Sequence, residues 1–103
     1  MNPGLNPVPK FLLGRIMQTS GALGTLDPRS KLLALARHAA GDWGDIDAHD
    51  RAVNENSFKN GGTLVSIYKD SRGVRFYVIT EHDRSGTNVE LHISDIMLSL
   101  QKC

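Results

Sequence analysis

Residues 63–93 read TLVSIYKDSRGVRFYVITEHDRSGTNVELHI, and this stretch decides the fold. Apolar and polar side chains alternate along three runs, 63–69, 74–81 and 87–93, which is the period of half-buried strands. Between the first two runs, Asp70–Gly73 supplies the Asp, Ser and Gly that favour tight turns. The stretch therefore predicts a meander of three antiparallel strands.

The alternation gives the predicted sheet one apolar face and one polar face. We expect helices to cover the face that carries Val65, Ile67 and Phe76. The other face would then lie open, with aromatic and basic groups suited to a protein partner or to single-stranded RNA. This candidate binding face comprises Ser66, Tyr68, Arg75 and Tyr77. A plain solvated sheet surface is the alternative interpretation.

A strand and two helices are predicted ahead of the meander. Residues 11–19 are apolar enough for a first strand. Asp27 before Pro28 is typical of a helix start, because Asp accepts from free amides and Pro fits the first turn. This helix should run to about Ala40, and a second helix should span 47–60. The first helix is expected to bury the apolar residues along one of its faces: Leu32, Leu35, Ala36, Ala39 and Ala40.

Together these elements predict an α+β fold in the order β-α-α-β-β-β-α, with a last helix after Ser94. We expect an antiparallel sheet of three to four strands, with two to three helices on one face. Residues 1–10 carry prolines and no apolar period, so they are expected to be a flexible leader. Residues 11–103 are expected to form a single domain.

The whole chain has the composition of one small soluble domain. It holds 103 residues with a formal net charge of +1, and its single cysteine, Cys103, excludes an internal disulfide framework. No apolar run approaches the roughly 20 residues of a membrane helix. We therefore expect a cytoplasmic protein without membrane contact or cofactor. We expect no metal ion either, since no spacing of the acidic residues is diagnostic of a metal site.

Two polar clusters are candidates for chemistry. The first, at the end of the predicted helix and in the glycine-rich loop that follows it, consists of His38, Asp42 and Trp43. A histidine beside a carboxylate can form a base with its orienting acid. The second, where a strand leaves the sheet, consists of Glu81, Asp83 and Arg84. An acid or base beside an arginine suits phosphodiester chemistry. Each cluster also has a structural interpretation, as the residues of a helix end or of a turn.

The same residues belong to two motifs, HxxGDWG at 38–44 and ITExDRSxT at 79–87. With these motifs the chain resembles a family of small, uncharacterised bacterial proteins associated with plasmids, phages and other mobile genetic elements. The resemblance covers about residues 12–96 and implies no particular activity. It implies that the two motifs act as one unit. In that unit we expect Arg84 to pair with Asp42 or Asp45, and Trp43 to pack across the junction.

Two functions from different classes are compatible with these features. The first is an accessory binding module of a mobile element, whose partner is a protein or a nucleic acid. The second is an endoribonuclease that resembles RelE-like toxins, which have a similar order of elements and cleave mRNA. The near-neutral charge favours the first, because binding RNA phosphates benefits from many Lys and Arg residues. An edge strand or the polar face also offers a route to a homodimer, and the sequence selects neither.

Overall fold

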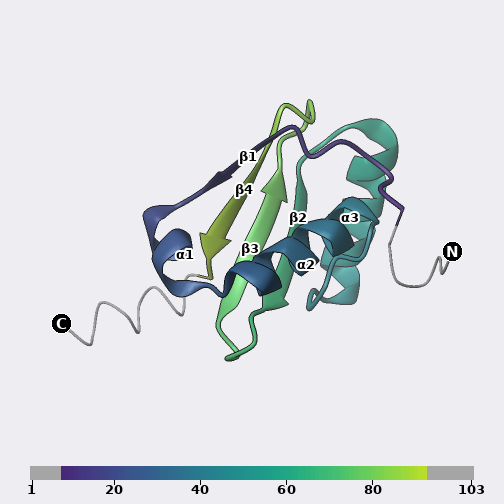
Figure 1. Cartoon of the computed structure of the whole chain (residues 1–103). Helices are drawn as coiled ribbons and strands as arrows, with labels where there is room; N and C mark the ends of the chain where they lie inside the picture. The colour runs from purple at the N-terminus through teal and green to yellow at the C-terminus, as the bar shows by residue number, and fades with distance from the viewer. Residues whose placement is uncertain (1–7, 93–103) are drawn as a thin grey trace, which may run out of the picture.

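The structure, a computed structural model, describes residues 8–92. Its elements follow one another as β1 (Arg15–Gln18), α1 (Ser20–Thr25), α2 (Pro28–Ala39), α3 (Ala48–Asn60), β2 (Leu64–Lys69), β3 (Arg75–Thr80) and β4 (Gly86–Leu91) (Figure 1). The fold is α+β, as the sequence predicts. The predicted order is wrong between β1 and β2, where it has two helices and the structure has three, because the short helix α1 precedes the helix that begins at Pro28. The helix predicted after Ser94 lies outside the described residues.

The four strands form one sheet in the order β1-β4-β3-β2. The meander of β2, β3 and β4 is antiparallel, as predicted. The expectation of a wholly antiparallel sheet is wrong, because β1 runs parallel to β4, with Arg15 opposite Gly86. The reason lies in the helices between β1 and β2, which carry the chain to the far edge of the sheet. The meander starts at that edge and returns beside β1 in the same direction as β1.

The helices are divided between one face of the sheet and one edge. α2 packs against β2 and β3, and α1 packs against β4, so both cover the same face (Figure 1). α3 lies beside β2. The core between the sheet and the first two helices contains Ala22, Leu26, Ala34, Tyr68, Phe76, Val78, Val89 and Leu91.

The start of α2 agrees with the sequence, and its buried face agrees in part: Ala39 is buried and Leu35 packs against the core, as predicted. The Asp27 carboxylate accepts a hydrogen bond from the Ser30 N–H at 2.9 Å and caps the helix as predicted. Ala34, His38 and Ala39 point into the protein, whereas the expected core residue Leu32 is 69% exposed. The side chain of His38 is hydrogen-bonded to the sheet, and these bonds fix the rotation of the helix about its axis.

The register of the β2–β3 hairpin corrects the predicted binding face. Ser66 pairs with Val78 and Tyr68 pairs with Phe76, so both Ser66 and Tyr68 are buried under the helices. Arg75 and Tyr77 lie on the opposite face, so the four predicted residues do not share one surface. The open face instead contains Val65, Ile67, Arg75, Tyr77, Ile79, Asn88 and Glu90.

The outer edge of β2 is closed by groups that imitate a neighbouring strand. The Asn54 side chain of α3 donates to the Val65 carbonyl at 2.7 Å and accepts from the Val65 N–H at 3.1 Å. Two residues along, the Ile67 N–H donates to the Trp43 carbonyl and the Ile67 carbonyl accepts from the Asp45 N–H. No further strand can pair with this edge at Val65 and Ile67, because their outward groups are already bonded.

Replacing Asn54 by alanine should therefore destabilise the protein markedly. Asn54→Ala removes two hydrogen bonds from a buried position, which we expect to lower the free energy of unfolding by about 2–3 kcal/mol. Urea denaturation followed by circular dichroism measures this loss. The matched control is Asn56→Ala on the exposed side of α3, which should change stability by less than about 0.5 kcal/mol. Equal losses in the two variants would contradict the role given to Asn54.

Candidate functional site

The centre of the candidate site is His38, which α2 holds against the sheet. His38 is fully buried, and its two ring nitrogens face hydroxyl groups of two neighbouring strands. Nδ1 lies 2.5 Å from Ser66 Oγ of β2, and Nε2 lies 2.8 Å from Thr80 Oγ1 of β3. Thr80 Oγ1 in turn lies 2.7 Å from Thr87 Oγ1 of β4. The four side chains form a buried polar chain, and each of them is 0% exposed.

The direction of every hydrogen bond in the buried polar chain can be derived from Thr87, its last member. The Thr87 hydroxyl donates to the Leu13 carbonyl at 2.6 Å, which uses its only proton. Thr87 must therefore accept from Thr80, and Thr80 must accept from the Nε2–H of His38. In the neutral ring, Nδ1 is then an acceptor for the Ser66 hydroxyl. The chain thus selects one tautomer of His38.

Burial also determines the charge of His38. Loss of hydration, together with the nearby positive charge of Arg84, lowers the pKa of His38 to about 4. At neutral pH the imidazole is uncharged, and both ring nitrogens are engaged within the protein. Because no atom of the ring reaches solvent, His38 holds elements together and has no route to an external substrate.

The aromatic residues around His38 join the two motifs. Phe11 packs edge-on against His38 at 5.4 Å between ring centroids, and stacks on Trp43 at 6.1 Å. The Arg84 guanidinium lies 5.7 Å from the centre of the Phe11 ring. The motifs therefore meet directly, through the bond between His38 and Thr80, and also through Phe11, a residue that the sequence assigned only to a strand. Among residues 8–92, no acceptor reaches the indole N–H of the buried Trp43.

Arg84 binds backbone carbonyls and does not pair with an acid. Its guanidinium donates to the carbonyls of Gly62 at 2.6 Å, Glu81 at 3.0 Å and Ser57 at 3.1 Å. The expected ion pair with Asp42 or Asp45 is therefore wrong. A guanidinium has five donors, so this one side chain can bind the carbonyls of α3 and of the two loops at the same time.

The acidic residues of the predicted site point away from His38. Asp42 forms an exposed ion pair with Arg37 at 2.7 Å, and this bond lowers the pKa of the Asp42 carboxyl. Hydrogen bonding to Ser85, from its hydroxyl and from its N–H at 3.0 Å, lowers the pKa of Asp83 within the turn. Glu81 contributes its backbone carbonyl to Arg84. The structure thus brings His38, Trp43 and Arg84 together, and leaves the carboxylates of the other three residues outside the cluster.

The loop that carries Trp43 depends on a glycine. Gly44 has a φ of +74°, and a Cβ at this position would overlap the Ile67 carbonyl oxygen. The close approach lets residues 43–45 lie along β2 as a single parallel bridge. The Tyr68 hydroxyl donates to the Asp42 carbonyl at 2.5 Å and ties the other side of the loop to the sheet.

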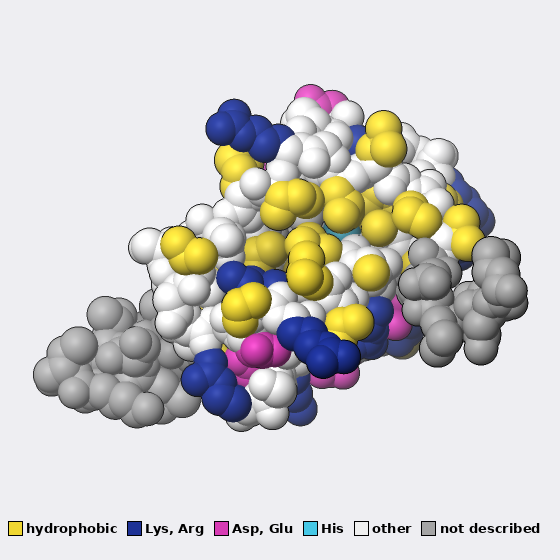
Figure 2. All heavy atoms as spheres, viewed as in Figure 1, with side chains coloured by type: hydrophobic (Ala, Val, Ile, Leu, Met, Phe, Trp, Pro, Cys, Tyr) yellow, Lys and Arg dark blue, Asp and Glu magenta, His cyan; other side chains and the backbone are white. Residues whose placement is uncertain are grey.

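A second feature lies on the outside of the polar cluster. An apolar hollow of about 520 Å³ is lined by Pro9, Phe11, Leu12, Leu13, Gly14, Ile16 and Ala39. Within this lining, Leu12 is 79% exposed and Ile16 of β1 is 45% exposed. Figure 2 shows that hydrophobic side chains gather across this side of the molecule, the side from which α2 is seen. Such a surface marks a site of contact with another molecule more often than a plain solvated surface.

The described residues offer neither a metal site nor a membrane helix. Within 8–92, no three His, Cys, Asp or Glu side chains gather closely enough to hold a metal ion. Over the same range, each helix is too short or too polar to cross a bilayer.

The chain matches no protein-family model, no curated protein and no solved structure.

The buried state of His38 predicts a pH dependence of stability. Between pH 6.5 and about 4, the unfolded chain binds a proton at this histidine and the folded protein does not. Stability should therefore fall as the pH decreases through this window, by about 3 kcal/mol in total. Urea denaturation at several pH values measures the slope. His38→Phe should abolish this contribution, whereas the exposed His49→Gln should keep it.

Gly44→Ala should destabilise the loop that carries Trp43. The added methyl group combines a strained positive φ with a clash against β2, and we expect a loss of about 2–4 kcal/mol. Gly24→Ala is the matched control, because a Cβ there meets no atom within 4 Å. Thermal unfolding of both variants should show a large decrease for the first and almost no change for the second. A neutral Gly44→Ala would contradict the close approach to β2.

Proposed function

We propose that this protein is a non-enzymatic binding module that binds another protein along the free edge of β1. The observation that carries the proposal is the contrast between the two edges of the sheet. One edge is closed by Asn54 and by residues 43–45, whereas the other is bordered by exposed apolar residues. A sheet edge that a protein leaves open beside apolar surface is suited to accept an added strand.

The free edge consists of backbone groups of two residues. The N–H groups of Arg15 and Thr19 donate to carbonyls of the β4 side, at Ser85 and Val89. Because backbone groups alternate along a strand, those of Ile16 and Gln18 point away from β4. Among residues 8–92, no hydrogen bond reaches the N–H or carbonyl groups of these two residues. They offer a partner segment two donors and two acceptors.

The surroundings of the free edge suggest the chemistry of the partner. A strand that pairs with β1 would direct alternate side chains toward the apolar hollow and the exposed Leu12 and Ile16. Residues 8–40 contain five Lys and Arg residues against one acid, Asp27. The best-fitting partner is therefore an extended segment with apolar residues at alternate positions and acidic residues at its flanks.

The alternative, a RelE-like mRNA endonuclease, receives less support. Such an enzyme needs an accessible acid or base beside an accessible arginine. Here His38 is sealed in the core, and Arg84 is engaged by backbone carbonyls. The proposal of a binding module requires no such pair and accounts for the exposed apolar surface.

Peptide selection followed by one backbone substitution tests the proposal. Extended peptides of 12 residues are selected from a random library on the wild-type chain, and their Kd values are measured by fluorescence anisotropy. Gln18→Pro removes the outward N–H and keeps the donors that face β4, so it should weaken binding about tenfold or more. Gln18→Ala is the matched control, because it loses only the side-chain bond to Lys31 and should bind within about twofold of wild type.

Two outcomes would contradict this function. Selected peptides that bind Gln18→Pro as tightly as wild type would place the binding surface elsewhere. Sedimentation that shows a wild-type dimer at micromolar concentration, and a monomer for Gln18→Pro, would assign the edge to a second copy of the chain. Circular dichroism of each variant confirms that the fold is intact before binding is compared.

A further inference from the structure

We propose that a second site, at the opposite edge of the sheet, binds a small organic cation: an ammonium group on a short aliphatic chain. The site is a hollow of about 270 Å³ between α3 and the open face of the sheet, here called the α3 hollow. Its lining residues are Ile46, Asp50, Val53, Asn54, Thr63, Val65, Ile67 and Tyr77. None of them belongs to the β1 edge, so this inference is independent of the proposed function.

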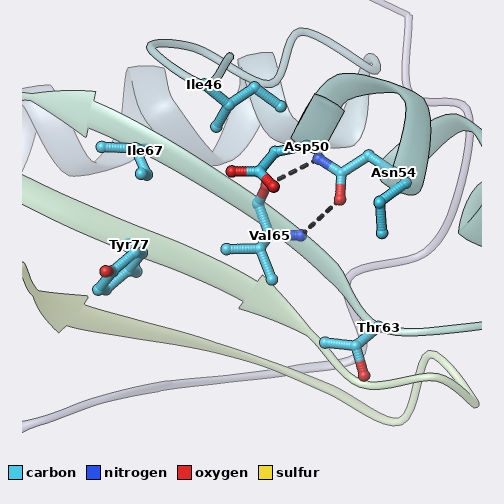
Figure 3. A pocket seen from close by; sticks show the side chains of 8 residues that line it. Ile46, Asp50, Asn54, Thr63, Val65, Ile67 and Tyr77 are labelled. Atoms are coloured by element: carbon cyan, nitrogen blue, oxygen red, sulfur yellow. Dashed lines mark hydrogen bonds between the residues drawn. The ribbon is translucent and has the colours of Figure 1, made fainter. Parts of the chain in front are cut away.

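The α3 hollow exists because α3 is fixed to the edge of β2. The two hydrogen bonds between Asn54 and the Val65 backbone hold the helix beside the strand. Asp50 lies one turn before Asn54 and therefore stands above the sheet surface. Figure 3 shows Ile46 and Asp50 on one side of the hollow, with Val65, Ile67 and Tyr77 on the other.

The walls of the α3 hollow favour an aliphatic group. Val65 and Ile67 form a half-buried floor, and Val53, which is 49% exposed, borders it from the helix. The volume is smaller than that of most pockets for drug-sized ligands, so it fits a chain of a few heavy atoms. Filling it with an aliphatic chain would remove exposed apolar surface from water.

Its electrostatics favour a positive charge. Asp50 is the only charged residue of the lining, and within the described part of the chain no cation or donor engages its carboxylate. The Asn54 amide is occupied by Val65 and cannot serve a ligand in its place. The Tyr77 ring stacks on His92 at 5.1 Å between ring centroids and also lines the hollow, where its π system can attract an ammonium group. Residues 41–62 carry five acids against two basic residues, which adds a negative field.

Other ligand classes fit the α3 hollow less well. An anion would approach the Asp50 carboxylate with repulsion and would find no basic residue in the lining. A neutral apolar molecule would cover the carboxylate and remove part of its hydration without replacing it. An alkylammonium ion satisfies both the apolar floor and the carboxylate.

An NMR titration of the full chain with n-butylammonium tests the site. Saturable shifts of the Val65, Ile67 and Tyr77 amide signals, with a millimolar Kd, are the expected result. Asp50→Asn should weaken binding at least fivefold. The control Glu55→Gln removes an exposed acid of the same helix outside the lining, and it should leave the Kd unchanged. n-Butanol, the neutral analogue, should bind at least fivefold more weakly than the amine.

A second set of titrations identifies the source of the ammonium group and defines the results that would contradict the inference. Nα-acetyl-lysine methylamide that produces the same shifts would identify the ligand as a lysine side chain of a protein, whereas response to the free amine alone would indicate a small metabolite. Equal binding of butanol and butylammonium would overturn the inference, as would equal weakening by Asp50→Asn and Glu55→Gln. Absence of saturable shifts at these amides would also overturn it.

Discussion

The buried hydrogen-bond chain from Ser66 through His38, Thr80 and Thr87 to the Leu13 carbonyl connects five parts of the protein. It joins β2, α2, β3, β4 and the segment that leads into β1. Each hydroxyl has one proton to give, so the chain has a single consistent direction when the histidine is neutral. This constraint sets the rotation of α2 on the sheet and the position of the N-terminal segment. The apolar hollow lies outside that segment and exists because the segment is held there.

The polar residues of the two motifs therefore stabilise the fold more than they contribute to exposed binding surfaces. His38 and Trp43 are buried, Gly44 permits the loop to touch β2, and Arg84 binds three backbone carbonyls from separate parts of the chain. The surfaces with binding potential come from residues outside the two motifs. At one edge of the sheet these are the apolar residues before and within β1, and at the other edge they lie between α3 and β2. A motif of polar residues can thus mark a structural junction and leave recognition to its surroundings.

Sequence reasoning found the elements well because their signals are local. The Asp27–Pro28 helix start, the second helix after Asp47 and the three strands of the meander depend on neighbours a few residues apart. The parallel pairing of β1 with β4 was not predictable in this way, since no local signal records which edge receives β1. The face of β2 was assigned by hydrophobicity, which favoured Val65 and Ile67. The hairpin register decided otherwise, and a shift of one residue exchanges the two faces.

The candidate site was predictable only in part, for the same physical reason. That His38, Trp43 and Arg84 belong together was expected from the motifs, but the partner that joins them, Phe11, lies far from both in sequence. Arg84 was expected to find an acid because opposite charges attract. In the folded chain, nearby carbonyls at loop ends engage its donors first. Ser66 and Thr80 carry a weak signal, since polar residues on the covered face of a sheet point to a buried polar partner.

The bond between Thr87 and Leu13 spans 74 positions along the chain, and this separation has a consequence for synthesis. β1 and the apolar residues before it are made before the other described elements, whereas the strand they pair with is made last among them. Until β4 appears, the histidine of α2 has no complete set of hydroxyl partners, and the core cannot close. The core therefore cannot close until residue 87 has been made, and until then the apolar segment before β1 has no strand to pair with.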